Sequence, residues 1–308
     1  MKRRNETYTD MLARLFPVPG IRLGINSPHS KCITFQVTED CNLRCSYCYQ
    51  GCKTHRKMSF ETAKAAIDML LAADERTNQY ITSTEAAGVV LDFIGGEPLL
   101  EVELIDRILD YFVEQTFRLH HPWGIRWKAS MATNGTLYFR PEVQRFLDKW
   151  MTHLSLSVSI DGDKQLHDSC RVFPDGSGSY DLAIAAAKDY MAKHDGTIGS
   201  KMTIAPGNVC YLYHAVVGLL NVGYREINLN CVYEKGWTLD HAATLYTQLK
   251  QLADYILTLD SQPFLSIFSE IIGHPMREDE TQNWCGGTGL MLAVDCDGLF
   301  FPCLRYMG

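Results

Sequence analysis

The chain has 308 residues, of which 46% are hydrophobic, and its 29 basic and 36 acidic residues give a formal net charge of -7. The acidic balance argues against a nucleic-acid-binding protein, and the apolar content argues against a disordered chain. We expect a cytosolic protein without a membrane span, because no apolar run reaches the ~18 residues that a span needs and the first residues lack the apolar stretch of a secretion signal.

A buried strand is predicted over residues 32–37, and it leads directly into a group of cysteines. Ser59 is placed to cap the helix that follows, in which apolar residues share one face: Phe60, Ala63, Ile67, Leu70 and Leu71. A second apolar strand over residues 89–94 ends in Gly95-Gly96-Glu97-Pro98, and the next helix has its apolar stripe between Leu104 and Phe112. Strand and helix therefore alternate from the first strand onward.

Two further strands show a period of two. One alternates at Ile125, Trp127, Ala129 and Met131, ends in Thr133-Asn134-Gly135, and precedes a helix that Pro141 can begin. The other alternates at Leu154, Leu156, Val158 and Ile160 and ends in Asp161-Gly162. Six strand–helix units are completed by a helix over about 180–194, a strand over about 198–205, a helix over about 211–220, a strand at Ile227, Leu229, Cys231 and Tyr233, and a helix over about 238–259.

Strands that alternate with helices at this spacing predict a parallel sheet with right-handed crossovers. Six units are too few for a closed eight-stranded barrel, so the predicted fold is α/β, a partial (β/α)6 TIM-like barrel over residues 31–260. In such folds the chemistry gathers at the carboxyl ends of the strands. That edge is expected to hold the cysteines, the Gly-Gly-Glu-Pro segment, Asn134 and the polar residues of the fourth strand.

The segments outside the barrel are predicted from composition. Residues 1–30 are an N-terminal segment, and residues 261–284, which contain Pro263, Gly273, Pro275 and a charged run, are expected to be a linker. Residues 285–308 predict a β-hairpin with Asp297-Gly298 as its turn.

The eleven cysteines indicate metal or redox chemistry rather than disulfides in a reducing compartment. Four fall within twelve residues, at Cys41, Cys45, Cys48 and Cys52, whereas Cys32, Cys170, Cys210 and Cys231 are scattered and are expected to be small buried hydrophobic residues. Thiolates without a neighbouring His suit an iron–sulfur cluster or zinc, and the spacing differs from that of bacterial ferredoxins. If only the first three bind a four-iron cluster, one iron stays open to an exogenous molecule.

The spacing Cys41-x3-Cys45-x2-Cys48, with Tyr47 before the third cysteine, resembles the signature of the radical S-adenosylmethionine (radical SAM) enzymes. The resemblance implies that these three cysteines bind a catalytic [4Fe-4S] cluster whose open iron holds S-adenosylmethionine, and that Cys52 is a spare thiol. It further implies that a set of residues contacts the cofactor, including its amino group, ribose and carboxylate: Tyr47, Gly95, Gly96, Glu97, Pro98, Asn134, Ser157, Ser159 and Asp161.

The run from Ser159 to Gly162, followed by His167, Asp168 and Arg171, resembles the peptide-modifying branch of the family. Arg171 is the implied partner of the cofactor carboxylate, because guanidinium pairs with carboxylate through two hydrogen bonds. Each of these assignments has a simpler alternative in a turn, the solvated face of a strand, or an ordinary salt bridge.

Near the end of the sequence, Cys285, Gly298 and Cys303 are separated by twelve and four residues. This resembles the opening of the SPASM or twitch extension and implies that Cys285 and Cys303 hold an auxiliary [4Fe-4S] cluster, with Cys296 outside the pattern. The family pattern continues with further cysteines, so we expect a truncated extension, or else a degenerate one; two cysteines packed in a hairpin are the simple alternative. Because 40 residues precede Cys41, we expect no leader-binding winged-helix domain of the kind found in several peptide maturases.

The resemblance covers about residues 30 to 305 and implies an oxidoreductase that modifies a peptide or protein, with an electron donor such as flavodoxin or ferredoxin. Cleavage of S-adenosylmethionine then gives a 5′-deoxyadenosyl radical that takes hydrogen from a peptide residue. Crosslinking of a ribosomal peptide, for example through a thioether, is the first expectation; formylglycine formation, as in anaerobic sulfatase maturation, is the second, and epimerisation the third. An alternative of another class is a non-catalytic iron–sulfur electron carrier or a zinc-stabilised binding module.

Overall fold

The computed structural model describes residues 31–51, 53–72, 88–194, 198–233, 236–269 and 291–307. Their strands form one nine-stranded sheet in the order β7-β6-β5-β4-β3-β2-β1-β8-β9. Every neighbouring pair is parallel except β8 and β9, which are antiparallel. The predicted α/β architecture with six consecutive parallel strands is confirmed, and short strands extend the sheet at both edges.

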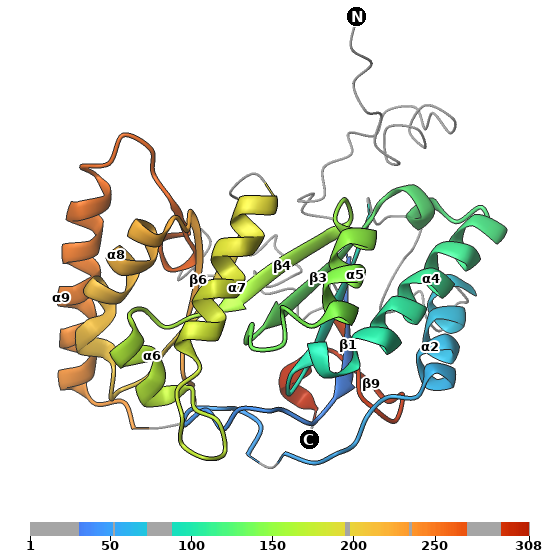
Figure 1. The fold of residues 1–308 in the computed structure, drawn as a ribbon, viewed down its shortest axis with the longest axis horizontal. Helices are drawn as coiled ribbons and strands as arrows, with labels where there is room; N and C mark the ends of the chain where they lie inside the picture. Colours follow the sequence, from blue (N-terminus) through green and yellow to red (C-terminus); the bar gives the residue numbers. More distant parts are fainter. Residues whose placement is uncertain are drawn as a thin grey trace, which may run out of the picture.

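The strands are β1 (Lys31–Thr38), β2 (Val89–Gly95), β3 (Trp127–Thr133), β4 (Leu154–Ser159), β5 (Gly199–Ile204), β6 (Glu226–Cys231), β7 (Phe264–Leu265), β8 (Met291–Val294) and β9 (Phe300–Phe301). The α-helices are α2 (Phe60–Ala72), α4 (Val102–Arg118), α5 (Pro141–Trp150), α6 (Lys164–Cys170), α7 (Tyr180–Lys193), α8 (Leu212–Val222) and α9 (Leu239–Ile256). Short 3-10 helices are η1 (Pro98–Glu101), η2 (Pro122–Ile125), η3 (Val209–Tyr211), η4 (Ser266–Phe268) and η5 (Leu304–Tyr306). Figure 1 shows the strands in the middle of the molecule, with α2, α4 and α5 on one side of the view and α6 to α9 on the other.

The alternation of apolar residues decides which face of each strand packs against the helices. On β4, Leu154, Leu156 and Val158 are buried, whereas Ser157 and Ser159 on the opposite face are only partly buried. The same period of two on β1 buries Ile33 and Phe35 against the helices. The polar face of the strands therefore lines the inside of the partial barrel.

Several predicted boundaries differ from the structure. Ile125 ends η2 instead of beginning β3, because Pro122 fixes the first turn of that 3-10 helix, and Tyr233 lies beyond β6 with 72% of its surface exposed. Helix α6 was not predicted. Within the segment expected to be a linker, Phe264 and Leu265 form β7 and pair with β6.

The C-terminal hairpin has the predicted turn. Strands β8 and β9 pair antiparallel, Gly298 has a φ of +87°, and its N–H donates to the carbonyl of Asp295 at 3.1 Å. Glycine adopts this left-handed conformation without steric cost. The hairpin also joins the barrel sheet, because β8 runs parallel to β1 with Cys32 opposite Met291 and Phe35 opposite Val294.

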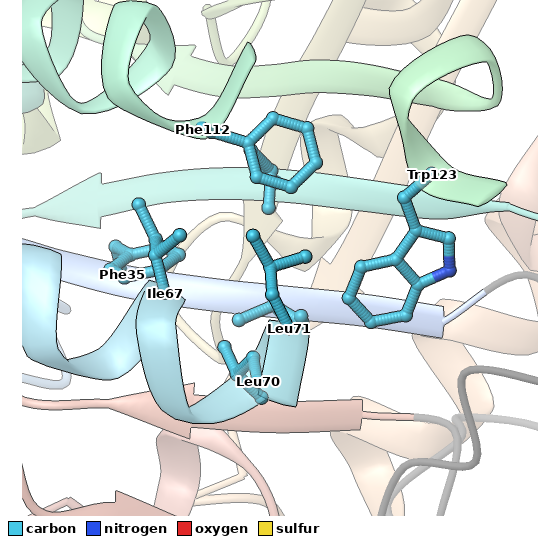
Figure 2. A pocket seen from close by; sticks show the side chains of 8 residues that line it. Phe35, Ile67, Leu70, Leu71, Phe112 and Trp123 are labelled. Atoms are coloured by element: carbon cyan, nitrogen blue, oxygen red, sulfur yellow. The ribbon is translucent and has the colours of Figure 1, made fainter. Parts of the chain in front are cut away.

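An apolar pocket lies between α2, α4 and the first two strands. Figure 2 shows Phe112 and Trp123 beside Leu70 and Leu71 of α2. The lining is apolar and belongs to the main hydrophobic core. The pocket is therefore a gap in core packing, and it offers no group that would orient a ligand.

Replacement of Phe112 by alanine is expected to lower the free energy of unfolding by about 3–5 kcal/mol, because it removes a buried ring and enlarges an existing gap. Urea unfolding followed by circular dichroism measures the change. Tyr246 on α9 is the matched control, since its ring is 71% exposed and its removal is expected to change stability by less than about 0.5 kcal/mol. Equal losses for the two variants would contradict the packing described here.

Candidate functional site

The three predicted cluster cysteines lie on the loop that leaves the carboxyl end of β1 and leads to α2. Figure 1 shows this loop running past the edge of the sheet at which β1 ends. Cys41 is buried, and Cys45 and Cys48 are partly buried. The Cys48 N–H donates to the carbonyl of Cys45 at 3.2 Å, so a tight turn joins the last two thiols.

Two of the three thiols accept hydrogen bonds. The Leu43 N–H donates to Cys41 Sγ at 3.4 Å, and Lys53 Nζ donates to Cys48 Sγ at 3.4 Å. Burial raises the pKa of Cys41 and raises that of Cys45 to about 11, while the positive charge of Arg171 acts in the opposite direction on Cys45. A bound metal centre would supply the positive charge that these buried thiolates need.

The donor set of three cysteine thiols suits an iron–sulfur cluster. Among the residues that the structure describes, no three His, Cys, Asp or Glu side chains converge on a point that would hold one metal ion. A single zinc ion needs four ligands at about 2–2.3 Å from one centre. In an iron–sulfur cluster the thiolates bind different irons, so they do not need to meet at one point.

The Gly-Gly-Glu-Pro segment packs directly against the start of the cysteine loop. The Gly96 N–H donates to the carbonyl of Thr38 at 3.0 Å, and the Glu97 N–H donates to that of Asp40 at 2.8 Å. A Cβ atom on Gly96 would lie 2.1 Å from the Asp40 carbonyl oxygen and 2.7 Å from the Cys41 Cβ. Glycine is therefore required at this position because the two backbones approach so closely.

Glu97 is buried and follows the carboxyl end of β2. Its Oε1 accepts hydrogen bonds from Thr133 Oγ1 at 2.6 Å and from the Leu99 N–H at 3.1 Å, and its Oε2 accepts from the Asn134 N–H at 2.8 Å. Burial raises the pKa of this carboxyl, whereas the three donors lower it. A carboxylate offers about four lone-pair sites, so Oε2 keeps capacity for one further donor such as an amine. Pro98 begins η1 directly after it.

Asn134 joins the loop after β3 to the cysteine loop. Its Nδ2 donates to Asn42 Oδ1 at 2.8 Å, and Asn42 Nδ2 donates to Thr136 Oγ1 at 2.7 Å. Thr136 in turn donates from its N–H and its hydroxyl to Asn134 Oδ1. The three side chains close a ring of hydrogen bonds, which fixes Asn42 next to Cys41.

Asp161, at the end of β4, binds protein groups with both oxygens. Arg171 donates to it from Nε at 2.9 Å and from Nη2 at 3.2 Å, the Thr203 N–H donates at 3.0 Å, and the Tyr47 hydroxyl also donates. Asp161 is fully buried, and Arg171 is 8% exposed. The structure thus brings Tyr47, Asp161 and Arg171 together, but as partners of one another; a contact between any of them and the cofactor stays a prediction.

Ser157 and Ser159 line the inside of the partial barrel. A Cβ on Gly199 of β5 would lie 2.7 Å from Ser157 Oγ, and Ser159 pairs in register with Lys201. The two hydroxyls therefore face the interior between β4 and β5. The contact of both serines with the cofactor stays a prediction.

The C-terminal cysteines divide into three cases. Cys285 lies outside the described residues, as does Cys52 of the first loop. Cys303 is partly buried and lies between β9 and η5. Burial raises the pKa of Cys32 to about 12, with smaller contributions from Asp92 and then Cys303. Cys296 is buried and its thiol donates to the Gln36 carbonyl at 3.3 Å, so it is occupied in packing.

The prediction that the scattered cysteines are buried was wrong. Cys32, Cys170 and Cys231 are partly buried, and Cys210 is exposed. Cys32 faces the barrel interior because its neighbour Ile33 faces the helices, and Cys210 lies on η3 at the surface.

His167 is a site residue to which the sequence assigned no role. Burial lowers its pKa to about 4, so the ring is neutral at pH 7. Its Nδ1 accepts from the Asp161 N–H at 3.4 Å, and its Nε2 lies 3.0 Å from the hydroxyl of Ser179, which donates to the Arg171 carbonyl. The ring therefore holds Asp161 and Arg171 in place.

A surface depression lies at the opposite end of the sheet. It is lined by Arg225, which precedes β6, by Pro263, which precedes β7, and by residues of α8 and the end of α9. It contains none of the predicted site residues, and active sites of such barrels lie at the carboxyl ends of the strands.

No helix within the described residues is both long and apolar enough to cross a membrane.

These observations define a partial parallel α/β barrel with three cysteine thiols on the loop after its first strand, a donor set that suits an iron–sulfur cluster. Residues 35–207, more than half of the chain, match the Radical SAM superfamily. The chain belongs to this superfamily, whose members use a [4Fe-4S] cluster and S-adenosylmethionine. The predicted recognition is confirmed.

The similar proteins are distant and longer. An uncharacterised protein of Methanocaldococcus jannaschii, MJ0907, is 28% identical over 67% of this chain and 64% of its own length. The radical SAM cyclopropyl synthase TigE of Paramaledivibacter caminithermalis is 22% identical over 89% of this chain and 57% of its own length. The chain thus spans less than two-thirds of either relative.

Among solved structures, native anSMEcpe with bound AdoMet and the Cp18Cys peptide superimposes with a TM-score of 0.70 and 17% identity, over 91% of this chain and 75% of that one. At this identity the likeness establishes the fold of the partial barrel and nothing of the substrate.

Proposed function

We propose that the protein is a radical SAM enzyme that modifies a peptide or protein side chain. The observation that carries this proposal is the packing of the cysteine loop against the Gly96-Glu97 backbone, which puts three thiols and a buried carboxylate at one edge of the barrel. A carrier of electrons has no use for such a carboxylate. The peptide bound to anSMEcpe supports a peptide as the substrate class.

Cys41, Cys45 and Cys48 would hold the [4Fe-4S] cluster, and Glu97 would accept a hydrogen bond from the amino group of S-adenosylmethionine through Oε2. When bound, these two groups supply an electron and a 5′-deoxyadenosyl radical that abstracts hydrogen from carbon. The chain's own contribution is to hold the target carbon close and to exclude water inside the barrel.

The inside of the barrel carries polar groups that suit a substrate. Thr34 Oγ1 donates to Asp92 Oδ2 at 3.5 Å, while Ser130 and the charge of Lys201 also stabilise this carboxylate against the burial that raises its pKa. Lys201 is exposed although it lies on a central strand, so the interior is open to solvent. We propose that Asp92 and Lys201 face the bound peptide.

The same proposal assigns Cys285 and Cys303 to an auxiliary cluster in a segment over residues 285–308, after a connection over 261–284. Cys303 follows β9, and β8 of the same hairpin pairs with β1, so an auxiliary cluster there would lie beside the barrel. Thioether or other crosslinking of a ribosomal peptide is the first reaction proposed, and formylglycine formation is the second. A flavodoxin or ferredoxin in the cytosol would supply electrons.

The proposal is tested by anaerobic reconstitution with iron and sulfide, addition of dithionite and S-adenosylmethionine, and chromatography for 5′-deoxyadenosine. Iron-loaded protein that yields none would favour an electron carrier. Coexpression with a candidate precursor peptide then separates the reactions, because a crosslink removes two hydrogens and joins two residues in fragment spectra, whereas formylglycine changes one residue.

Replacement of Glu97 by glutamine is expected to weaken binding of S-adenosylmethionine by about 10–100-fold, because a hydrogen bond to a charged group contributes about 1.5–3 kcal/mol. Anaerobic equilibrium dialysis of the iron-loaded protein measures this affinity. Glu101→Gln is the control, since Glu101 lies one turn away and pairs with Lys57. Equal affinities of wild type and Glu97→Gln for S-adenosylmethionine would show that Glu97 does not bind the cofactor.

A further inference from the structure

Cys45 and Arg171 lie on two segments that hydrogen-bond to each other through their backbones. The Arg44 N–H donates to the carbonyl of Val172 at 2.7 Å, and the Ser46 N–H donates to that of Cys170 at 3.0 Å. These two hydrogen bonds hold residues 44–46 beside residues 170–172, and the charge of Arg171 acts on the Cys45 thiol. The cysteine loop is thus joined through its backbone to the segment that follows α6.

The charges of Arg171 and Asp161 are shielded from water. Arg171 is 8% exposed, Asp161 is fully buried, and the guanidinium carbon lies 5.4 Å from the centre of the Tyr47 ring. Screening by salt and water is weak for buried charges, so both act strongly on a neighbouring centre. His167 and Ser179 fix the backbone of the pair, which keeps these charges at constant positions.

We propose that the buried Arg171–Asp161 pair sets the reduction potential of the cluster held by Cys45, with Arg171 favouring the reduced state and Asp161 opposing it. Reduction adds negative charge to the cluster, so a nearby cation stabilises the reduced form and a nearby anion destabilises it. The inference rests on the proposed function only in requiring that the cysteines bind an iron–sulfur cluster. In this role Arg171 and Asp161 do not bind the cluster, and they act on it only through their fixed charges.

The arrangement also explains why the arginine is bound to a carboxylate of the protein itself. An unpaired guanidinium at this depth would be costly to bury. Asp161 compensates its charge, and the Tyr47 hydroxyl and the Thr203 N–H donate to the same two carboxylate oxygens of Asp161. The difference between the distances of the two charges from the cluster then decides the net effect on its potential.

The test is a redox titration of reconstituted protein without S-adenosylmethionine, followed by electron paramagnetic resonance. Arg171→Met is expected to lower the equilibrium constant for one-electron reduction about tenfold, which is a midpoint about 59 mV more negative. Asp161→Asn is expected to shift the midpoint in the positive direction. Arg225→Met is the matched control, because Arg225 donates to backbone carbonyls at the opposite end of the sheet, and its midpoint should equal that of the wild type.

A purely structural role would change iron loading and leave the midpoint of the loaded fraction unaltered, which would overturn the proposal. Should Arg171→Met bind no iron, Asp161→Asn decides alone, and a midpoint that does not rise overturns it. Loss of S-adenosylmethionine binding in Arg171→Met with an unchanged midpoint would also overturn it and would favour cofactor contact. A wild-type cluster that titrates but cleaves no S-adenosylmethionine refutes the proposed function without affecting this measurement.

Discussion

Alanine at position 45 is expected to reduce both bound iron and 5′-deoxyadenosine formation to the background of the iron-free protein. Cys45 is the middle thiol of the loop, and hydrogen bonds from Arg44 and Ser46 to residues 172 and 170 fix the backbone on both sides of it. Loss of one thiolate leaves an iron of the cluster without its protein ligand. Iron and sulfide analysis, the electron paramagnetic resonance spectrum of the reduced protein and chromatography of the nucleoside products measure the effect.

The matched control is Cys210→Ala. Cys210 is an exposed thiol on η3, and its removal is expected to leave iron content and product formation at the level of the wild type. If Cys45→Ala kept its iron and its activity, another thiol would have to serve as the ligand, and the three-cysteine assignment would be wrong.

Alanine at position 96 is expected to disrupt the same site without removing a ligand. A Cβ there would lie 2.1 Å from the Asp40 carbonyl oxygen, so either the Gly96 backbone or the start of the cysteine loop must move. Cys41, whose Cβ would lie 2.7 Å away, moves with it. We expect cluster affinity to fall by roughly 10–100-fold, the effect typical of changes to groups that hold metal ligands.

Competition with an iron chelator measures this affinity, and thermal unfolding of the iron-free protein measures the accompanying loss of stability. Gly207→Ala is the control, because no described atom lies within 4 Å of a Cβ at that position. If Gly96→Ala retained iron as well as Gly207→Ala does, the close approach of β2 and the loop would not matter for the cluster.

Most of the barrel could be predicted because its strands and helices have strong periodicity. The alternation at Leu154, Leu156 and Val158 and the stripe of α4 both describe faces that are buried in the structure. Helix α6 was missed because it has seven residues and only His167 is buried, so it has no apolar stripe. Its one signal was Asp163, whose side chain caps the helix by accepting from the Leu166 N–H.

The candidate site could be located from sequence but its internal contacts could not. Parallel strands bring their carboxyl ends together, which is why the loop cysteines, Glu97 and Asp161 were expected at one edge. The partner with which a buried charged side chain pairs depends on its rotamer and on the path of the loop after α6. The pairing of Arg171 with Asp161, and the ring of Asn42, Asn134 and Thr136, are therefore visible only in three dimensions.

The parallel pairing of β8 with β1 has a consequence for synthesis of the chain. Strand β1 emerges from the ribosome first, yet the strand that hydrogen-bonds to its second edge ends at Val294. Contacts between such distant segments form late, because a long loop must close before they contribute. The strand that leads to Cys41 therefore stays open on one side until β8 has been synthesised, and we expect maturation of the metal centre to follow the pairing of these two strands.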